Sequence, residues 1–202
     1  MKKNKKILVL LALFLAVFAV GGTLAYLTDT TETMTNTFTF GKVNISLTEP
    51  HWVEADAEGV TPGQDVAKDP TVKVEADSKD AFVFVKVEVP AGQVGDPATT
   101  QPLFSIGSLG SGWTLISTET DGNTGDTTYV YGYGSANAMT SVAANTTLPA
   151  VFSEVTVNPN LTSDNISNIT GATADINVSA YAIQADDLNV TTPTAIWGVI
   201  NS

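Results

Sequence analysis

Residues 82–89 read FVFVKVEV, and this stretch decides the fold. Valines at 83, 85, 87 and 89 alternate with Phe82, Phe84, Lys86 and Glu88. Alternation with a period of two puts the valines on one face of a strand, and β-branched residues favour strands. The stretch therefore predicts a strand with one apolar face and a second face that is apolar at one end only.

The same alternation recurs along the chain between clusters of turn residues. Further strands are predicted at 42–48, 71–75, 113–117, 128–133, 151–157 and 174–184. The turn clusters lie at 61–63, 68–70, 107–112 and 121–126, and they are rich in Gly, Pro, Asn and Asp. Many short strands with regular turn signals are typical of a β-sandwich. We therefore predict an all-β, two-sheet sandwich, as one domain over residues 41–202.

One short helix is predicted near the C-terminus. Thr192 suits the N-cap and Pro193 the first helical position. Ile196, Val199 and Ile200 follow at helical spacing.

Residues 1–25 have the pattern of an export signal. The basic stretch MKKNKK is followed by fourteen apolar residues at 7–20, two glycines, and small residues at Thr23 and Ala25. A membrane anchor needs about 20 apolar residues, and an uncleaved anchor is the alternative. We predict a signal peptide that is cut between Ala25 and Tyr26, and a secreted protein without membrane attachment after cleavage.

Composition excludes several classes of function. The chain has 21 acidic residues and a formal net charge of −12, and it contains no arginine. Four of its nine lysines precede the apolar run, which leaves five lysines against 21 acids, or −16, after cleavage. Nucleic-acid binding requires a basic surface, so no nucleic-acid partner is expected. There is no cysteine, so an exported domain must depend on packing and sheet hydrogen bonds, which suits a Gram-positive surface.

The chain lacks the residues from which most hydrolytic sites are built. His51 is the single histidine. A zinc protease needs two or three good ligands, and a Ser-His-Asp triad would have to use the same histidine. We interpret His51 as a loop histidine beside a packed tryptophan, Trp52. No enzymatic activity, catalytic residue, metal or cofactor is expected.

The segment Asp121–Asp126 carries alternating oxygen ligands and resembles a fragment of a calcium loop. It lacks the twelve-residue pattern and the terminal glutamate of such a loop. A hairpin turn is the preferred interpretation.

Tyr129, Tyr131 and Tyr133 alternate, so they share one face of a predicted strand. An aromatic stripe of this kind can bind sugars or partner proteins, and it can also pack against a neighbouring sheet. The three tyrosines are therefore a candidate binding face.

Residues 26–40 separate the predicted cleavage site from the sandwich. The segment ends Thr35-Asn36-Thr37-Phe38-Thr39-Phe40, and threonine and phenylalanine favour extended chain. A lone strand leaves its backbone groups unpaired. This N-terminal arm is therefore either the first strand of its own sheet or an assembly strand that adds to a neighbouring subunit.

Several motifs resemble those of an exported Gram-positive family. The leader continues as GGTLAYLTD at 21–29, which resembles signal peptides processed by SipW-type signal peptidases, and NTFTFGKV at 36–43 resembles their usual continuation. TPG at 61–63, KDPTV at 68–72, the strand at 81–89 and AYAIQA at 180–185 follow in the same order. On these residues the chain resembles the TasA/camelysin (CalY) family.

The resemblance implies a jelly-roll-like sandwich and a fibre subunit or accessory protein of the biofilm matrix. The implied partners are a SipW-type signal peptidase during export, then the protein itself or a homologous matrix protein. A surface binding module for carbohydrate or host protein is the alternative. A camelysin-like metallopeptidase ranks last, because one histidine cannot build a histidine-based zinc site. We expect a secreted, non-enzymatic structural protein of the cell surface or extracellular matrix.

Overall fold

The computed structural model describes residues 41–92, 101–167 and 174–202. The chain divides into the units Met1–Thr39 and Phe40–Ser202, and all described residues belong to the second. The predicted signal peptide, the Ala25–Tyr26 cleavage site and the arm at 26–40, including its candidate assembly strand Thr35–Phe40, lie outside the described residues.

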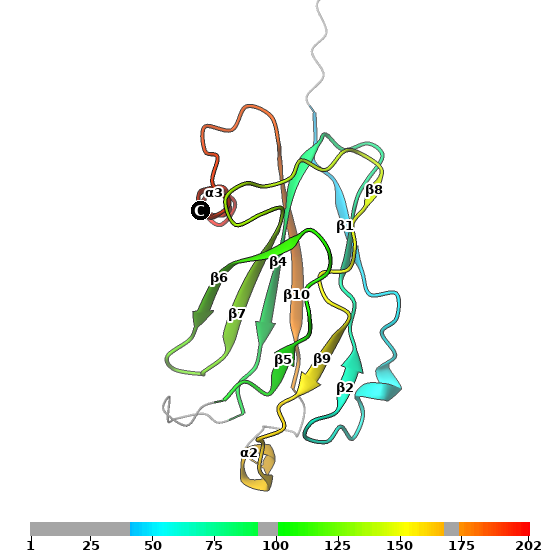
Figure 1. Ribbon diagram of the computed structural model, residues 1–202, viewed down its shortest axis with the longest axis vertical. Coiled ribbons are helices and arrows are strands. Elements are labelled where there is room, and N and C mark those ends of the chain that lie inside the picture. Colours follow the sequence, from blue (N-terminus) through cyan, green and yellow to red (C-terminus); the bar gives the residue numbers. More distant parts are fainter. Residues whose placement is uncertain (1–40, 93–100, 168–173) are drawn as a thin grey trace, which may run out of the picture. The chain divides into compact units, whose positions relative to one another are not determined.

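The strand that the valine alternation predicts lies inside a four-stranded antiparallel sheet. The order is β10 (Asn177–Gln184), β4 (Ala81–Val89), β7 (Thr127–Tyr133) and β6 (Trp113–Thr120) (Figure 1). In the register, Val85 lies opposite Tyr131 and Val87 opposite Tyr129, so the valines and the tyrosines share a face. The four valines have no exposed surface, which confirms that this face is buried.

The second layer consists of two three-stranded antiparallel sheets. One has the order β1 (Ile45–Thr48), β3 (Thr71–Val74), β8 (Thr146–Thr147). The other has the order β2 (Asp65–Ala67), β9 (Glu154–Val157), β5 (Phe104–Ile106). The chain continues from β2 into β3 and from β8 towards β9, so the two sheets are one layer with an interruption (Figure 1).

The interruption contains a proline on each of the two neighbouring chain segments, Pro70 and Pro149. Proline has no backbone N–H to donate to a strand ladder. Wider-spaced hydrogen bonds still join the segments, from Val151 N to Pro70 O at 2.9 Å and from Lys68 N to Ser153 O at 3.1 Å.

The two layers enclose a core in which valine predominates. The predicted all-β sandwich is confirmed, with the interruption as the difference from two continuous sheets. Besides the β4 valines, the buried core contains Val66, Val72, Val74, Trp113, Tyr131, Val142, Leu148, Val151, Phe152 and Val155.

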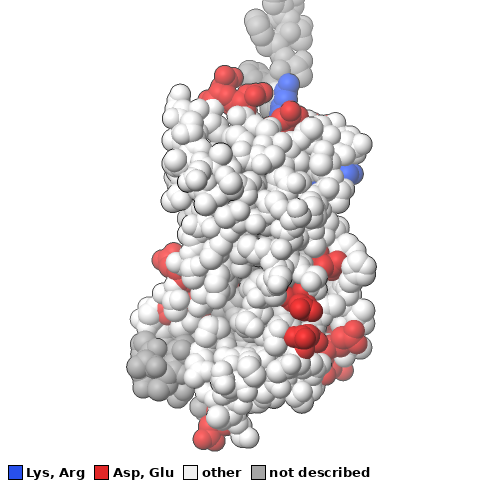
Figure 2. Space-filling view, in the orientation of Figure 1, with Lys and Arg blue, Asp and Glu red and all other residues white. Residues whose placement is uncertain are grey.

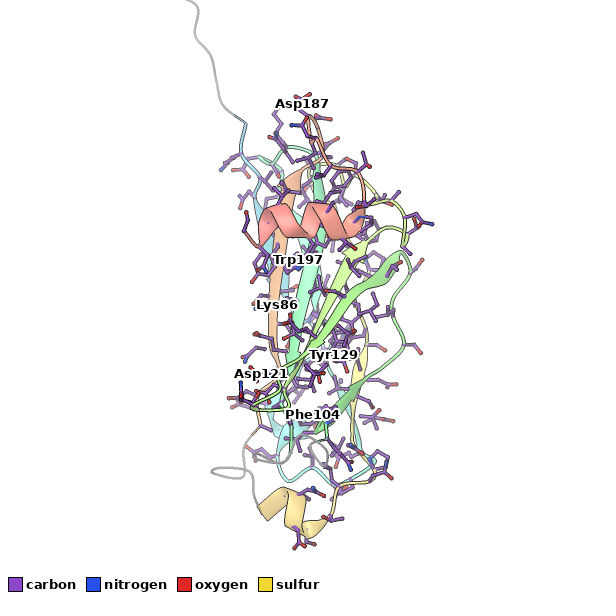
Figure 3. All side chains as sticks on the ribbon, turned by 90° about the vertical axis from the view of Figure 1, so that its left-hand side faces the viewer. Lys86, Phe104, Asp121, Tyr129, Asp187 and Trp197 are labelled. Atoms are coloured by element: carbon purple, nitrogen blue, oxygen red, sulfur yellow. The ribbon has the colours of Figure 1, made fainter. Side chains whose placement is uncertain are left out.

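The helix α3 (Pro193–Ile200) covers part of the outer face of the four-stranded sheet. The predicted N-cap is confirmed, because Thr192 Oγ1 accepts a hydrogen bond from Ala195 N at 3.4 Å. Trp197 packs on Phe84, with ring centroids 5.6 Å apart. Lys86 lies on the same face beyond the helix and pairs with Glu88 at 3.1 Å (Figure 3). The apolar end of this β4 face is therefore the end that the helix covers.

Several short elements were not predicted, among them β2, β5, β8, the 3-10 helix η1 (Glu54–Ala57) and α2 (Ser163–Ser167). The prediction of a turn at 68–70 is wrong. These residues link β2 to β3 and are buried, although their types usually mark turns. The predicted hairpin turn at 121–126 is confirmed between β6 and β7.

The β5–β6 connection, residues 107–112, crosses from one layer to the other. Two hydrogen bonds hold it against residues 149–151 at the interruption of the second layer. Gly110 N donates to Val151 O at 2.8 Å, and Trp113 Nε1 donates to Pro149 O at 2.8 Å. A Cβ on Gly110 would overlap the backbone carbonyl oxygen of Ala150. This position therefore requires glycine for space.

We expect Gly110→Ala to lower the free energy of unfolding by about 1–3 kcal/mol, because the crossing must move away from its hydrogen-bond partner. Gly122→Ala is the matched control, since a Cβ there meets nothing within 4 Å. Urea unfolding of both variants measures the difference. Equal effects of the two substitutions would contradict the close contact at Gly110.

Candidate functional site

The two side edges of the sandwich differ. On one edge β1 packs along β10. On the other, β5 and β6 are edge strands of separate sheets, and a cleft of about 470 Å³ lies there. The lining is mainly apolar and comes from both layers (Figure 3 labels Phe104 and Tyr129). It consists of Pro102, Phe104, Ser105, Ile106, Gly107, Leu109, Leu115, Tyr129, Tyr131, Asn158 and Pro159.

Two tyrosines of β7 line the cleft side by side. The rings of Tyr129 and Tyr131 are nearly parallel, at 14°, with centroids 6.3 Å apart. Tyr131 is buried, and burial together with the neighbouring Tyr129 raises the pKa of its phenol. The phenol therefore stays neutral at physiological pH, and this part of the cleft carries no charge.

Leu115 of β6 shows that the cleft is incompletely covered. It lies opposite Tyr131 in the β6–β7 register and therefore faces inward, yet 45% of its surface is exposed. Leu109 is also exposed, at 37%. Inward-facing leucines of a sandwich are normally buried by the opposite sheet. Their exposure indicates a surface that is suited to cover by another apolar group.

The β5 wall carries Phe104 and Ile106, which are separated by one residue. Both side chains are partly buried against the core. The nearby Asn158 already uses its side-chain amide, since Nδ2 donates to Pro102 O at 2.9 Å. The cleft thus offers alternating apolar side chains on two walls and few polar groups for recognition.

The three tyrosines of the predicted binding face have two different environments in the structure. All three tyrosines pack against the core, and Tyr129 and Tyr131 also line the cleft. Tyr133 instead packs edge-on against Trp113, with ring centroids 5.4 Å apart, and does not line the cleft. Sequence reasoning missed the β5 wall, although Phe104 and Ile106 alternate just before the glycine-rich connection.

The His51 region combines a correct and a wrong prediction. His51 lies in the loop after β1, and its Nδ1 is 2.7 Å from Asp69 Oδ2. Trp52 was expected to be packed, but it is 38% exposed, and Lys68 Nζ lies 4.9 Å from the centroid of its ring. Within the described residues, no three His, Asp or Glu side chains gather in an arrangement that could hold a metal ion.

The Asp121–Asp126 turn uses its first carboxylate internally. Asp121 Oδ1 accepts hydrogen bonds from Asn123 N at 2.7 Å and Thr124 N at 3.2 Å. These bonds lower the pKa of Asp121. The carboxylate therefore stabilises the hairpin connection.

Neither a protein-family model, nor a curated protein, nor a solved structure matches this chain. In the described part of the chain, no helix has the length and apolar character needed to span a membrane. The function of the cleft has to be inferred from its own chemistry.

Proposed function

We propose that this protein is a secreted, non-enzymatic structural subunit of the cell surface or biofilm matrix, in line with its resemblance to the TasA/camelysin family. Subunits would join by strand addition, with the arm at 26–40 of one copy entering the cleft of the next. The open β5–β6 edge and its exposed, inward-facing Leu115 carry this proposal.

The end of the arm matches the cleft in spacing and chemistry. Phe38 and Phe40 are separated by one residue, as are Tyr129 and Tyr131 on one side of the cleft and Phe104 and Ile106 on the other. Alternate residues of a strand lie about 6.6–6.8 Å apart on one face. A docked arm could thus place both phenylalanines against these walls while its backbone pairs with an edge strand.

The ends of the domain support head-to-tail contact. The first described residues, blue in Figure 1, lie at the end of the domain opposite β5 and α2. A contact between the segment that precedes residue 41 in one copy and the cleft of the next would be heterologous, and it would extend as an open chain unless its rotation closes a ring.

Because the subunits carry charge of the same sign, the attraction between them has to come from apolar groups. Figure 2 shows a face that is white over much of its area, with acidic residues at its upper end, at its left edge, at the lower right and at its lower tip. Like-charged subunits repel one another, and salt screens this repulsion. Assembly through the cleft would therefore be promoted by salt.

A carbohydrate-binding module is less well supported. Sugar recognition needs several polar groups beside an aromatic face, and besides the phenol hydroxyls of Tyr129 and Tyr131 the polar side chains of the cleft are Ser105 and Asn158. The amide of Asn158 is already bonded within the chain. An apolar peptide segment suits this lining better.

Export is expected to end with cleavage between Ala25 and Tyr26, because small residues and glycines follow the short apolar run. N-terminal sequencing of protein from the culture medium measures the site. Recovery of a chain that starts at Met1, in the membrane fraction, would contradict secretion.

The proposal is tested at Leu115. We expect Leu115→Asp to abolish fibres of the mature protein, since it places a charge where an apolar arm must dock. Val199→Asp on α3 is the matched control, because Val199 is 47% exposed, close to the 45% of Leu115. Electron microscopy and circular dichroism separate assembly from folding. Normal fibres from a folded Leu115→Asp variant would refute the cleft as the acceptor.

A further inference from the structure

The chain between β1 and β3 forms a long excursion whose two ends are tied together by charged groups. Lys68 Nζ lies 2.8 Å and 3.0 Å from the two carboxylate oxygens of Glu49. Asp69 binds His51 twice, with Oδ2 2.7 Å from Nδ1 and with Oδ1 accepting the backbone N–H at 2.9 Å. The loop between these ends contains η1 and β2.

This cluster lies where charges are costly. Lys68 and Asp69 are each only 7% exposed, beside a core of valines, and Lys68 Nζ lies 4.9 Å from the Trp52 ring centroid. Apolar residues often stabilise such a site as well as a buried ion pair does, whereas removing one partner is strongly destabilising. The pairs therefore act chiefly to hold the two ends of the loop in one arrangement.

The far part of the loop is bonded to Val157, the last residue of β9. Gly63 N donates to Val157 O at 2.9 Å, and Val157 N donates to Gln64 O at 2.8 Å. Val157 pairs with Phe104 of β5, and the next two residues, Asn158 and Pro159, line the cleft. Between Gln64 and Lys68 lies β2, which pairs with β9, so the charged cluster connects to the cleft through the β2–β9 ladder.

We infer that Glu49, His51, Lys68 and Asp69 form a clamp that positions the cleft. By fixing the chain at the end of β2, the clamp supports the β2–β9 ladder and its continuation at Gly63 and Gln64, and so helps to keep Val157–Pro159 beside β5. These four are positioning residues, since none of them lines the cleft. The inference rests on the proposed function only in treating the cleft as the acceptor for the arm.

Amide hydrogen exchange of the mature protein tests the clamp directly. In Glu49→Gln we expect the Gly63 and Val157 amides to exchange about tenfold faster, and the exchange rate of Val85 in the four-stranded sheet to change less than about twofold. This difference is expected because the substitution promotes local opening near the loop and not global unfolding. His51→Ala, at an exposed side chain, should accelerate the same amides by a smaller factor. Glu88→Gln is the control, because it removes the partner of Lys86 on the outer face.

Unchanged exchange at Gly63 and Val157, or an equal acceleration at Val85, would overturn the clamp. If Glu49→Gln fails to fold, His51→Ala decides by the same criterion. The critical concentration for fibres of each folded variant is a separate measurement, and a rise for the clamp variants but not for Glu88→Gln is expected. Wild-type protein that forms no fibres would refute the proposed function, while the exchange data would still decide on the clamp.

Discussion

Mature protein that lacks residues 26–40 is expected to remain a folded monomer under conditions in which the complete mature protein forms fibres. The strands and α3 of the described core all come from residues 45–200, and we expect them to fold without the arm. The deletion removes the proposed donor and leaves the cleft intact. Size-exclusion chromatography measures whether the protein is a monomer, circular dichroism whether it is folded, and electron microscopy whether it forms fibres.

The same experiment separates the two roles of the arm. An unfolded deletion product would indicate that residues 26–40 are the first strand of their own sheet, and unchanged fibres would end the strand-addition proposal. A finer pair of variants lies within the arm. Phe38→Ala/Phe40→Ala should prevent assembly, whereas Thr37→Ala/Thr39→Ala should permit it, because only the phenylalanines supply large apolar side chains.

Phe84→Ala is expected to cost about 3–5 kcal/mol of stability, the usual range for a fully buried phenylalanine. Phe84 has no exposed surface and lies beneath α3, with Ile196 and Trp197 packed in the same cluster. Its removal leaves a cavity beneath α3 that the helix can refill only by shifting. Loss of the helix contact should also alter the fluorescence of Trp197.

Phe104→Ala provides the comparison, because Phe104 is only partly buried at the cleft. Less apolar surface is lost there, and the expected cost is about 1 kcal/mol. Urea unfolding of both variants gives the two values. A Phe84→Ala variant as stable as Phe104→Ala would show that α3 is not held through this residue.

The elements that could be predicted are those whose signals are local. The four valines of β4 alternate over a full strand length, so both the strand and its buried face follow from residues next to one another. Thr192 and Pro193 likewise mark the start of α3 through interactions within one turn. The alternation of Tyr129, Tyr131 and Tyr133 correctly placed the three on one face of β7.

The cleft could not be predicted, because it depends on how distant segments meet. The strand β5 has three residues, which is too short for a periodic signal. Leu115 alternates like any inward-facing residue, and only its position at an open edge leaves it exposed. Lys68 and Asp69 have the composition of a turn, and their burial depends on Glu49 and His51 about twenty residues earlier.

The difference between the two side edges limits what the proposed contact can build. One edge is closed by β1 against β10, and the cleft lies on the other. A subunit with one donor arm and one acceptor cleft has a valence of two. Such particles grow in line and cannot branch through this contact, and every filament ends with one empty cleft and one unused arm. Cross-linking of filaments into a network would then require a second protein or a different surface.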